Sequence, residues 1–337
     1  MPRNEVKSSL ERIPLAELHS HVGGAVDASI LWTLAHEQGI KLPTKNYLEF
    51  EKLITVERQY KNFREIDRAK YHWTELIQSS PLAMEPAVQL TLGGAYRSHN
   101  VVLHEIRYNP MKRNRGGERD LDHIIFASIR GMERALLEYP EVKAGIILML
   151  DREFPLRLNE IIYQKAIKYQ PRGIIGIDVA GPQSRQFRIQ EYADLFRDAK
   201  KRGFGVTIHT GEEGGLKEMR FVVQEIEPHR IGHGVMAWRD RKLMGLLRDK
   251  GITLELCPTS NLRVGVFESI AALRRAYKTL RQAGVKLTIN TDGPEMYKTN
   301  LWRELMLLLE EKVFRSEEIQ QFISNAFAAT FIKNGKP

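Results

Sequence analysis

The sequence has a single cysteine, Cys257, among its 337 residues. One cysteine excludes an intramolecular disulfide, so nothing in the chain requires an oxidising compartment. No apolar run approaches the roughly 20 residues that a membrane-spanning helix needs. Residues 1–13 include basic side chains but no apolar segment typical of a secretory signal. We therefore expect a cytoplasmic protein that does not enter a membrane.

The sequence also lacks the mixture of basic and aromatic residues that is typical of nucleic-acid-binding surfaces. Its formal net charge is +9, from 51 Lys and Arg against 42 Asp and Glu. The densest basic stretch, residues 112–119, contains no aromatic residue and has the composition of a loop. Elsewhere basic residues stand beside acids, as in 239–242 and 310–312. This pattern predicts solvated helix faces and no nucleic-acid partner.

Short apolar stretches alternate with helical patterns along most of the chain. Buried strands that alternate with helices are typical of a parallel sheet. The expected strands are residues 15–21, 101–108, 144–150, 173–180, 205–209, 230–235, 252–257 and 286–290. Eight such units predict a (β/α)8 barrel of the TIM type, formed as a single domain by residues 1–337. The helical stretch 43–100 predicts a helical insertion between the first and second strands.

Histidines gather at the expected ends of these strands, where barrel enzymes carry their reactive side chains. His19 and His21 end the first strand, and their spacing of two residues places both on one face of it. His209 ends the fifth strand, His233 ends the sixth, and Asp292 follows the eighth. Alone, each is also compatible with a turn or a packed histidine. Together, three imidazoles and a carboxylate from strands one, five and eight predict a site for one divalent metal ion.

Five motifs resemble those of the adenosine deaminase family in the amidohydrolase superfamily, and they occur in the family's order over nearly the whole chain. They are His19-Ser20-His21, Ile177-Asp178-Val179-Ala180-Gly181, Thr207-Ile208-His209-Thr210-Gly211-Glu212, Arg230-Ile231-Gly232-His233-Gly234 and Asn290-Thr291-Asp292. The fourth strand carries no lysine at its end, where binuclear relatives in the superfamily have a bridging one. This agrees with a member that binds one metal ion.

The resemblance implies a metal cofactor and its ligands. One zinc ion per chain would be held by His19, His21, His209 and Asp292. A zinc-bound water has a lowered pKa, so that hydroxide is available near neutral pH. The resemblance thus implies a hydrolase that removes the 6-amino group of an aminopurine nucleoside and releases ammonia.

The resemblance also implies proton-transfer and substrate-binding residues. Glu212 would protonate purine N1 as a general acid, and His233 would orient the attacking water and take its proton. Gly181 would offer its backbone N–H to purine N3, while Asp178 would orient neighbouring groups in the substrate site. Gly293 occupies the position of a second substrate contact.

Two positions depart from the family pattern and leave the substrate open. Gly23 stands where the family commonly has an aspartate that contacts the ribose 5′-hydroxyl. Gly293 stands where it commonly has an acid that contacts purine N7, and Glu295 is a candidate substitute. Adenosine or 2′-deoxyadenosine is the first expectation for the substrate. Methylthioadenosine, aminodeoxyfutalosine and adenine are the alternatives, because loss of a hydroxyl-binding group relaxes discrimination.

Three other functions remain open from the sequence. The first is a different zinc hydrolase on the same barrel, and the second is a binding or growth-factor-like protein without a metal. The third is nucleic-acid binding, which the distribution of charge disfavours. The paired cysteines of cytidine-type zinc deaminases are absent, which excludes base editing by that route. The sequence makes no prediction about oligomeric state.

Overall fold

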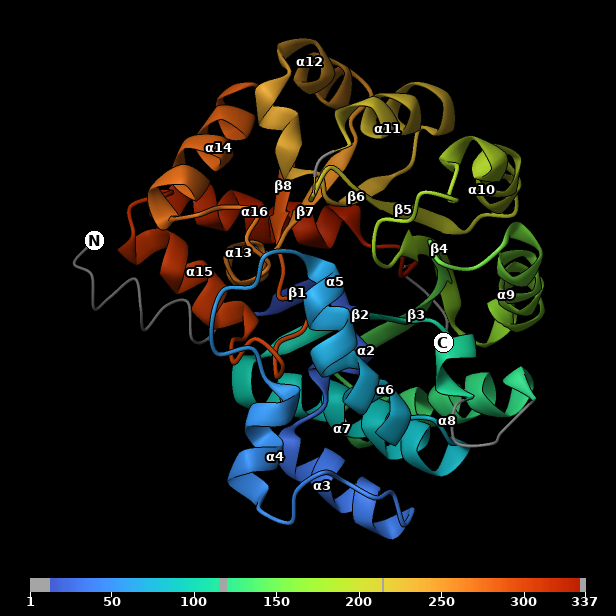
Figure 1. Cartoon of the computed structure of the whole chain (residues 1–337). Coiled ribbons are helices and arrows are strands. Elements are labelled where there is room, and N and C mark those ends of the chain that lie inside the picture. The colour runs from blue at the N-terminus through green and yellow to red at the C-terminus, as the bar shows by residue number, and fades with distance from the viewer. Residues whose placement is uncertain (1–12, 115–119, 214, 334–337) are drawn as a thin grey trace.

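A computed structural model describes residues 13–114, 120–213 and 215–333 of the chain. Most of the basic stretch 112–119 therefore lies outside the described residues. Within them, eight parallel strands follow one another in sequence order around a barrel (Figure 1). The strands are β1 Leu15–His21, β2 Val101–Tyr108, β3 Lys143–Asp151, β4 Ile174–Ala180, β5 Gly205–Thr210, β6 Arg230–His233, β7 Thr253–Leu256 and β8 Lys286–Ile289.

The predicted (β/α)8 barrel is confirmed, and the first two strands have the predicted bounds. The sixth is shorter than predicted because Gly234, in the left-handed region at φ +66°, turns the chain away after His233. Helices surround the strands (Figure 1). They are α8 Leu121–Glu138, α9 Leu156–Tyr169, α10 Ala193–Lys201, α11 Leu216–Phe221, α12 Arg241–Asp249, α13 Pro258–Arg263, α14 Ile270–Gln282, α15 Leu301–Glu310 and α16 Ser316–Ala329.

The segment between β1 and β2 folds into a series of short helices and one long one. They are α2 Val22–Ala25, α3 Ala28–Glu37, α4 Tyr47–Ile54, α5 Phe63–Ile66, a π-helix at Asp67–Tyr71, α6 His72–Ile77 and α7 Pro81–His99. Residues 55–62 are not helical, although helical periodicity was expected from 43 to 100. In Figure 1, α5 and α6 lie in front of the strands. This segment therefore supplies side chains to one end of the barrel.

The barrel closes between β1 and β8 through the residues that carry the predicted site. His21 N donates a hydrogen bond to Asp292 O over 2.6 Å, and Asp292 N donates one to His19 O over 2.8 Å. The sheet ladder here is reduced to a single bridge between Ser20 and Asp292. The main chain at this seam thus fixes the first and last parts of the site against each other.

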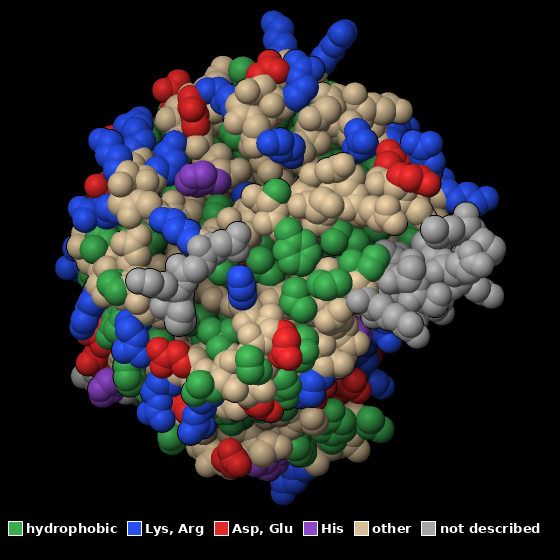
Figure 2. Space-filling model, turned by 180° about the vertical axis from the view of Figure 1, so that it is seen from behind, with side chains coloured by type: hydrophobic (Ala, Val, Ile, Leu, Met, Phe, Trp, Pro, Cys, Tyr) green, Lys and Arg blue, Asp and Glu red, His purple; other side chains and the backbone are tan. Residues whose placement is uncertain are grey.

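The surface opposite the view of Figure 1 is chemically mixed. Figure 2 shows hydrophobic side chains near the middle of this face, with Lys and Arg scattered around them and acidic side chains between. The basic residues do not form one continuous band on this face. Among the described helices, none combines the length and apolar character that crossing a membrane requires.

Candidate active site

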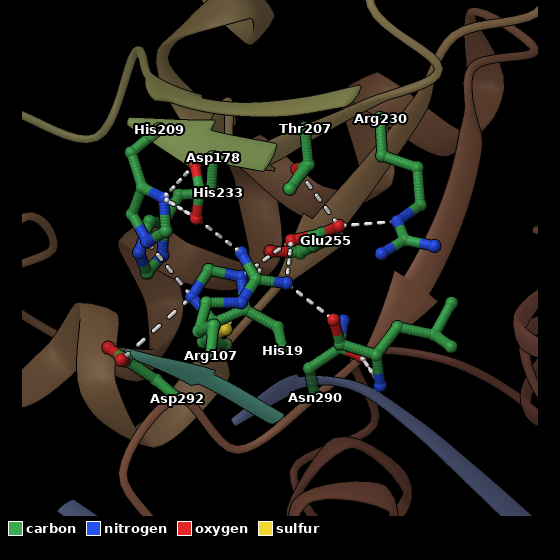
Figure 3. Close-up of polar contacts among 12 residues, drawn as sticks. His19, Arg107, Asp178, Thr207, His209, Arg230, His233, Glu255, Asn290 and Asp292 are labelled. Atoms are coloured by element: carbon green, nitrogen blue, oxygen red, sulfur yellow. Dashed lines mark hydrogen bonds and ion pairs between the residues drawn. The ribbon is translucent and has the colours of Figure 1, made fainter. Parts of the chain in front are cut away.

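Three imidazoles converge at the carboxyl end of the barrel, and Figure 3 shows two of them, those of His19 and His209. His19 and His21 come from β1, and His209 comes from β5. Their Nε2 atoms lie 3.1 Å apart between His19 and His21, 3.2 Å between His21 and His209, and 3.1 Å between His209 and His19. Because they come from strands of the barrel wall, the rings are fixed by the fold itself.

Asp292 completes this cluster from the residue that follows β8. Its Oδ1 lies 3.4 Å from His21 Nε2 and 3.9 Å from His19 Nε2, while its Oδ2 accepts a hydrogen bond from Ser260 Oγ. Asp292 has φ +67°, a left-handed conformation that is uncommon for a residue with a side chain. Such strained backbone often occurs at functional sites, and here it aims the carboxylate at the histidines.

A second layer of buried charges holds two of the imidazoles (Figure 3). Glu255 Oε2 lies 2.7 Å from His19 Nδ1, and Asp178 Oδ2 lies 2.9 Å from His209 Nδ1. Arg107 bridges the two carboxylates, at 2.8 Å from Asp178 and 3.0 Å from Glu255. Although burial opposes it, Arg107 helps to lower the pKa of each carboxylate to about 2. Both carboxylates are therefore ionised acceptors, which places a proton on Nδ1 of each histidine.

The donor set fits a zinc ion. With Nδ1 protonated, Nε2 of His19 and of His209 presents a lone pair, and these atoms face each other without a proton between them. Burial lowers the pKa of His19 and of His21 well below the usual range, so both rings are neutral. In a tetrahedral zinc site with Zn–N bonds of about 2.0–2.1 Å, the nitrogens are separated by about 3.3 Å. The observed 3.1–3.2 Å spacings are close to that value.

His233 lies beside this cluster and faces Glu212. His19, His209 and His233 also form a group whose ligand atoms lie within 4.8 Å of one another. However, Asn261 Nδ2 lies 3.1 Å from His233 Nδ1, and His233 Nε2 lies 3.7 Å from Glu212 Oε1. Burial lowers the pKa of His233 well below its usual range, so the ring is neutral. The geometry therefore connects His233 with the acid as well as with the other histidines.

Glu212 is the acid of this site. Burial raises its pKa well above the usual value, and the neighbouring Asp292 and Glu213 carboxylates raise it further. This shift favours the protonated carboxyl group, which is the form that can donate a proton. The chain brings this acid close to the imidazole cluster because Glu212 follows β5 by two residues.

A cavity in front of these side chains extends towards the segment between β1 and β2. Sequence reasoning predicted its inner end but not its outer wall, which carries Asp67, Asp151 and Lys112. Lys112 Nζ lies 2.9 Å from Asp151 Oδ2 and 3.8 Å from Asp67 Oδ1. The lining residues are His21, Phe63, Asp67, Tyr71, Glu75, Asn109, Lys112, Met149, Asp151, Ala180, Gly181, His209, Glu212, His233 and Asp292.

Gly181 lines the cavity as predicted, with its backbone in the left-handed region at φ +100°. A Cβ atom at this position would lie 3.1 Å from Asp151 Oδ2. The absence of a side chain leaves the Asp151 carboxylate and the Gly181 main chain next to each other at the cavity wall.

Three predicted substrate positions lie elsewhere. Asp178 is fully buried behind His209, where it orients that ring, and it is not among the described residues that line the cavity. Gly293 packs against Gly24: a Cβ at Gly24 would lie 2.8 Å from Gly293 Cα. Glu295 lines other cavities than the imidazole cluster does, and its expected part as a substitute acid stays a prediction.

The side chains of Tyr71 and Arg113 fill the space next to Gly23. A Cβ atom there would lie 3.0 Å from the Tyr71 ring and 3.2 Å from Arg113 Nη2. Tyr71 lines the active-site cavity, whereas Gly23 does not. The polar groups that face this end of the cavity are instead Asp67, Asp151 and Lys112.

Sequence reasoning missed the charges behind the histidines, although a signal was present. Glu105 and Arg107 interrupt the apolar pattern of β2, Glu255 interrupts β7, and Arg230 starts β6. A charge within a strand that is buried on both faces needs a charged partner. Which partner it finds depends on the barrel geometry and cannot be deduced from local sequence.

Comparison with known proteins agrees with this site. The family described as adenosine deaminase matches residues 14–336. Among similar proteins, the adenosine deaminase of Clostridium kluyveri is 26% identical over 322 residues, covering 96% of this chain and 90% of that protein. That of Shewanella loihica is 26% identical over 330 residues, covering 96% of each chain.

Solved structures share the fold. Arabidopsis N6-mAMP deaminase has a TM-score of 0.83 at 21% identity, covering 97% of this chain and 96% of that one. Adenine deaminase from Arthrobacter aurescens has a TM-score of 0.79 at 19% identity, covering 95% and 94%. A Burkholderia ambifaria amidohydrolase with bound zinc has a TM-score of 0.83 at 20% identity, covering 97% and 88%. Because the family match spans residues 14–336, this chain belongs to the adenosine deaminase family and is a hydrolytic deaminase.

Proposed function

We propose that this protein is a zinc-dependent deaminase that converts adenosine or 2′-deoxyadenosine, with water, to the corresponding 6-oxopurine nucleoside and ammonia. One observation carries the proposal: the Glu212 carboxyl group, whose pKa burial raises, and the His233 ring, whose pKa burial lowers, line the same cavity as the imidazole cluster. Hydrolytic removal of an amino group needs an acid on the ring side and a base on the water side. The site supplies both within 3.7 Å.

One zinc ion would be held by His19, His21, His209 and Asp292. The chemistry that zinc supplies when bound by such ligands is a coordinated water of lowered pKa, and hence hydroxide near neutral pH. Glu255 and Asp178 support this role because each keeps the proton of its histidine on Nδ1. Outer partners of this kind fix the ring orientation and raise the basicity of metal ligands.

Glu212 donates its proton to a ring nitrogen of the substrate, which makes the adjacent carbon more electrophilic. His233 holds and accepts one proton of the attacking water, and then returns it to the departing amino group, which leaves as ammonia. The proton from Glu212 stays on the ring nitrogen of the 6-oxopurine, and the second proton of the water passes back to Glu212. Asn261 lies next to His233 Nδ1 and restrains its ring. Gly181 presents its main chain at the cavity wall, where its N–H can bind an acceptor nitrogen of the purine.

The outer wall of the cavity favours a substrate that carries a sugar. Asp67 and Asp151 are acceptors that suit sugar hydroxyls, and Lys112 lies between them as a donor. Two carboxylates close together also disfavour a phosphate group at this position. The free base adenine has no hydroxyl groups to add hydrogen bonds to these carboxylates, so it would gain no affinity from them. Methylthioadenosine and aminodeoxyfutalosine remain the alternatives, since both keep sugar hydroxyls.

A comparison of substrates tests the proposal. Zinc-loaded protein is assayed for ammonia release with adenosine, 2′-deoxyadenosine, methylthioadenosine, aminodeoxyfutalosine and adenine. We expect the highest kcat/KM for adenosine or 2′-deoxyadenosine. Asp151→Asn should lower kcat/KM for adenosine by roughly 10–100-fold and leave adenine almost unchanged, because only the nucleoside uses that acceptor. Protein that binds zinc but releases ammonia from none of these compounds would overturn the proposal.

A further inference from the structure

The last described residues of the chain are anchored at the base of the barrel, at the opposite end from the imidazole cluster. Thr330 Oγ1 donates a hydrogen bond to Glu105 Oε1 over 2.7 Å, and Phe331 N donates one to the same oxygen over 2.6 Å. Ala329 O accepts a hydrogen bond from Arg230 Nη1 over 2.7 Å. Residues 329–331, which we call the C-terminal clamp, thus hydrogen-bond to two buried charged side chains, those of Glu105 and Arg230.

The Phe331 side chain occupies a space that the barrel strands leave for it. A Cβ atom at Gly205, the first residue of β5, would lie 2.0 Å from the Phe331 ring. One at Gly176 in β4 would lie 3.1 Å from it. The Arg230 guanidinium carbon lies 3.5 Å from the ring centroid, a cation–π contact. The position of the clamp is therefore defined by the residues of three strands.

Arg230 connects the clamp to the acid that holds His19. Its Nη2 lies 2.5 Å from Glu105 Oε2, and its Nε lies 2.5 Å from Glu255 Oε1. The other oxygen of Glu255 lies 2.7 Å from His19 Nδ1. All four side chains are at most 1% exposed, so water does not screen these contacts. A line of direct polar contacts thus runs from the C-terminal clamp to a predicted metal ligand.

We propose that Thr330 and Phe331, together with Glu105 and Arg230, are positioning residues for the metal site. The C-terminal clamp holds the Arg230 guanidinium group in place, and this group in turn orients the Glu255 carboxylate. The carboxylate then sets the ring orientation and the tautomer of His19. Arg230 is suited to this because its guanidinium donates in several fixed directions at once, whereas a lysine cannot. The inference rests on the metal site of the proposed function but is independent of its substrate.

The proposal is tested by zinc affinity, measured by competition with a chelator. Thr330→Val keeps the side-chain shape but removes the hydroxyl donor to Glu105. Arg230→Lys keeps the positive charge but removes the planar guanidinium group with its several N–H donors. Loss of an outer partner of a metal ligand lowers affinity about 10–100-fold. We expect about tenfold weaker zinc binding for Arg230→Lys and about threefold for Thr330→Val, which acts one contact further away. Phe327→Leu, a partly exposed position on α16, is the matched control and should bind zinc as wild type does.

Hydrogen exchange gives a second measurement that does not depend on any variant. Coupling between two sites is reciprocal, so if the clamp strengthens zinc binding, zinc must stabilise the clamp. Removing zinc from the wild-type protein should speed exchange of the Phe331 amide, which donates to Glu105, but not of amides in α10.

Visible spectra of the cobalt-substituted proteins give a third measurement. The wild type and Arg230→Lys should differ in these spectra, because the proposal expects the His19 ring to shift in the variant.

The outcomes separate the two proposals. If wild-type protein binds no zinc, the metal site of the proposed function is wrong and this inference falls with it. If wild type binds zinc and the variants only unfold at lower temperature, with unchanged zinc affinity and spectra, the clamp is merely structural and this inference alone is overturned.

Discussion

Glu212 and His233 face each other at 3.7 Å, between Oε1 and Nε2, and both lie next to the Asn261 amide. Burial acts on them in opposite directions: it raises the pKa of the Glu212 carboxyl group and lowers the pKa of the His233 ring. Each group is therefore neutral in the same pH range. A protonated acid next to a free imidazole can give a proton to one side of a substrate and accept one from the other.

Replacing Glu212 by glutamine should remove the proton donor and leave the metal site intact. We expect kcat to fall by about 10²–10⁴-fold, the usual contribution of general acid catalysis, with unchanged zinc content. Glu225→Gln is the matched control, because this glutamate is exposed, lies in the segment Val222–Ile226 and does not line the cavity. A near-normal rate in Glu212→Gln would show that another group supplies the proton.

Replacing His209 by alanine should remove zinc as well as activity. Its Nε2 lies within 3.2 Å of the other two imidazoles, and its loss leaves an incomplete donor set. We expect zinc affinity to fall by more than the roughly 10–100-fold caused by loss of an outer partner. Elemental analysis after dialysis checks this, with His36→Ala on the exposed side of α3 as the control. Equal zinc content in the two variants would contradict the assignment of His209.

The cavity acid Asp67 should produce a pH dependence near neutrality. Burial raises its pKa to about 6, although the Lys112 charge opposes this. Below that pH the carboxyl group is protonated, and above it the carboxylate is a stronger acceptor for a sugar hydroxyl. We expect kcat/KM for adenosine to rise as pH increases from about 5 to about 7, since this parameter reports groups of the free enzyme. The step should disappear in Asp67→Asn and persist in Glu65→Gln, an exposed acid on α5.

Because Gly24 lies in close contact with Gly293, we expect any larger residue at position 24 to destabilise the fold. A Cβ at Gly24 would lie 2.8 Å from Gly293 Cα, so helix α2, which contains Gly24, and the turn that contains Gly293 must move apart. We expect Gly24→Ala to lower the free energy of unfolding by about 1–3 kcal/mol. Gly94→Ala, in α7 where a Cβ has no neighbour within 4 Å, should instead raise it by roughly 0.5–1 kcal/mol. Denaturant titration of both variants decides whether this contact is as tight as observed.

The barrel and the inner end of the site could be predicted because both follow from local patterns. Apolar strands that alternate with helices define the architecture, and the architecture places strand ends together. His19, His21, His209 and Asp292 could therefore be grouped before any distance was known. The bounds of β1 and β2 were correct because Pro14 precedes the first strand, and Asn100, which ends α7 in the left-handed region, precedes the second.

The outer wall and the supporting charges could not be predicted from local sequence. Asp67 lies in a π-helix within the segment between β1 and β2, and nothing in its neighbourhood indicates that it meets Lys112 and Asp151. Arg107 and Glu255 are 148 positions apart, and only the curvature of the barrel brings them together. Contacts of this length depend on the complete fold, as does the role of Asp178 behind His209.

The seam between β1 and β8 has a consequence for the order of events during synthesis. His19 and His21 leave the ribosome before Asp292, which bonds to both of them through its main chain and follows some 270 residues later. The proposed ligand set is therefore incomplete until Asp292 has been synthesised. If these residues hold the ion as proposed, its capture in the final geometry waits for the residue that follows the last strand, and barrel closure and metal loading become one event. A ribosome-bound fragment that stops before β8 should remain unable to retain zinc.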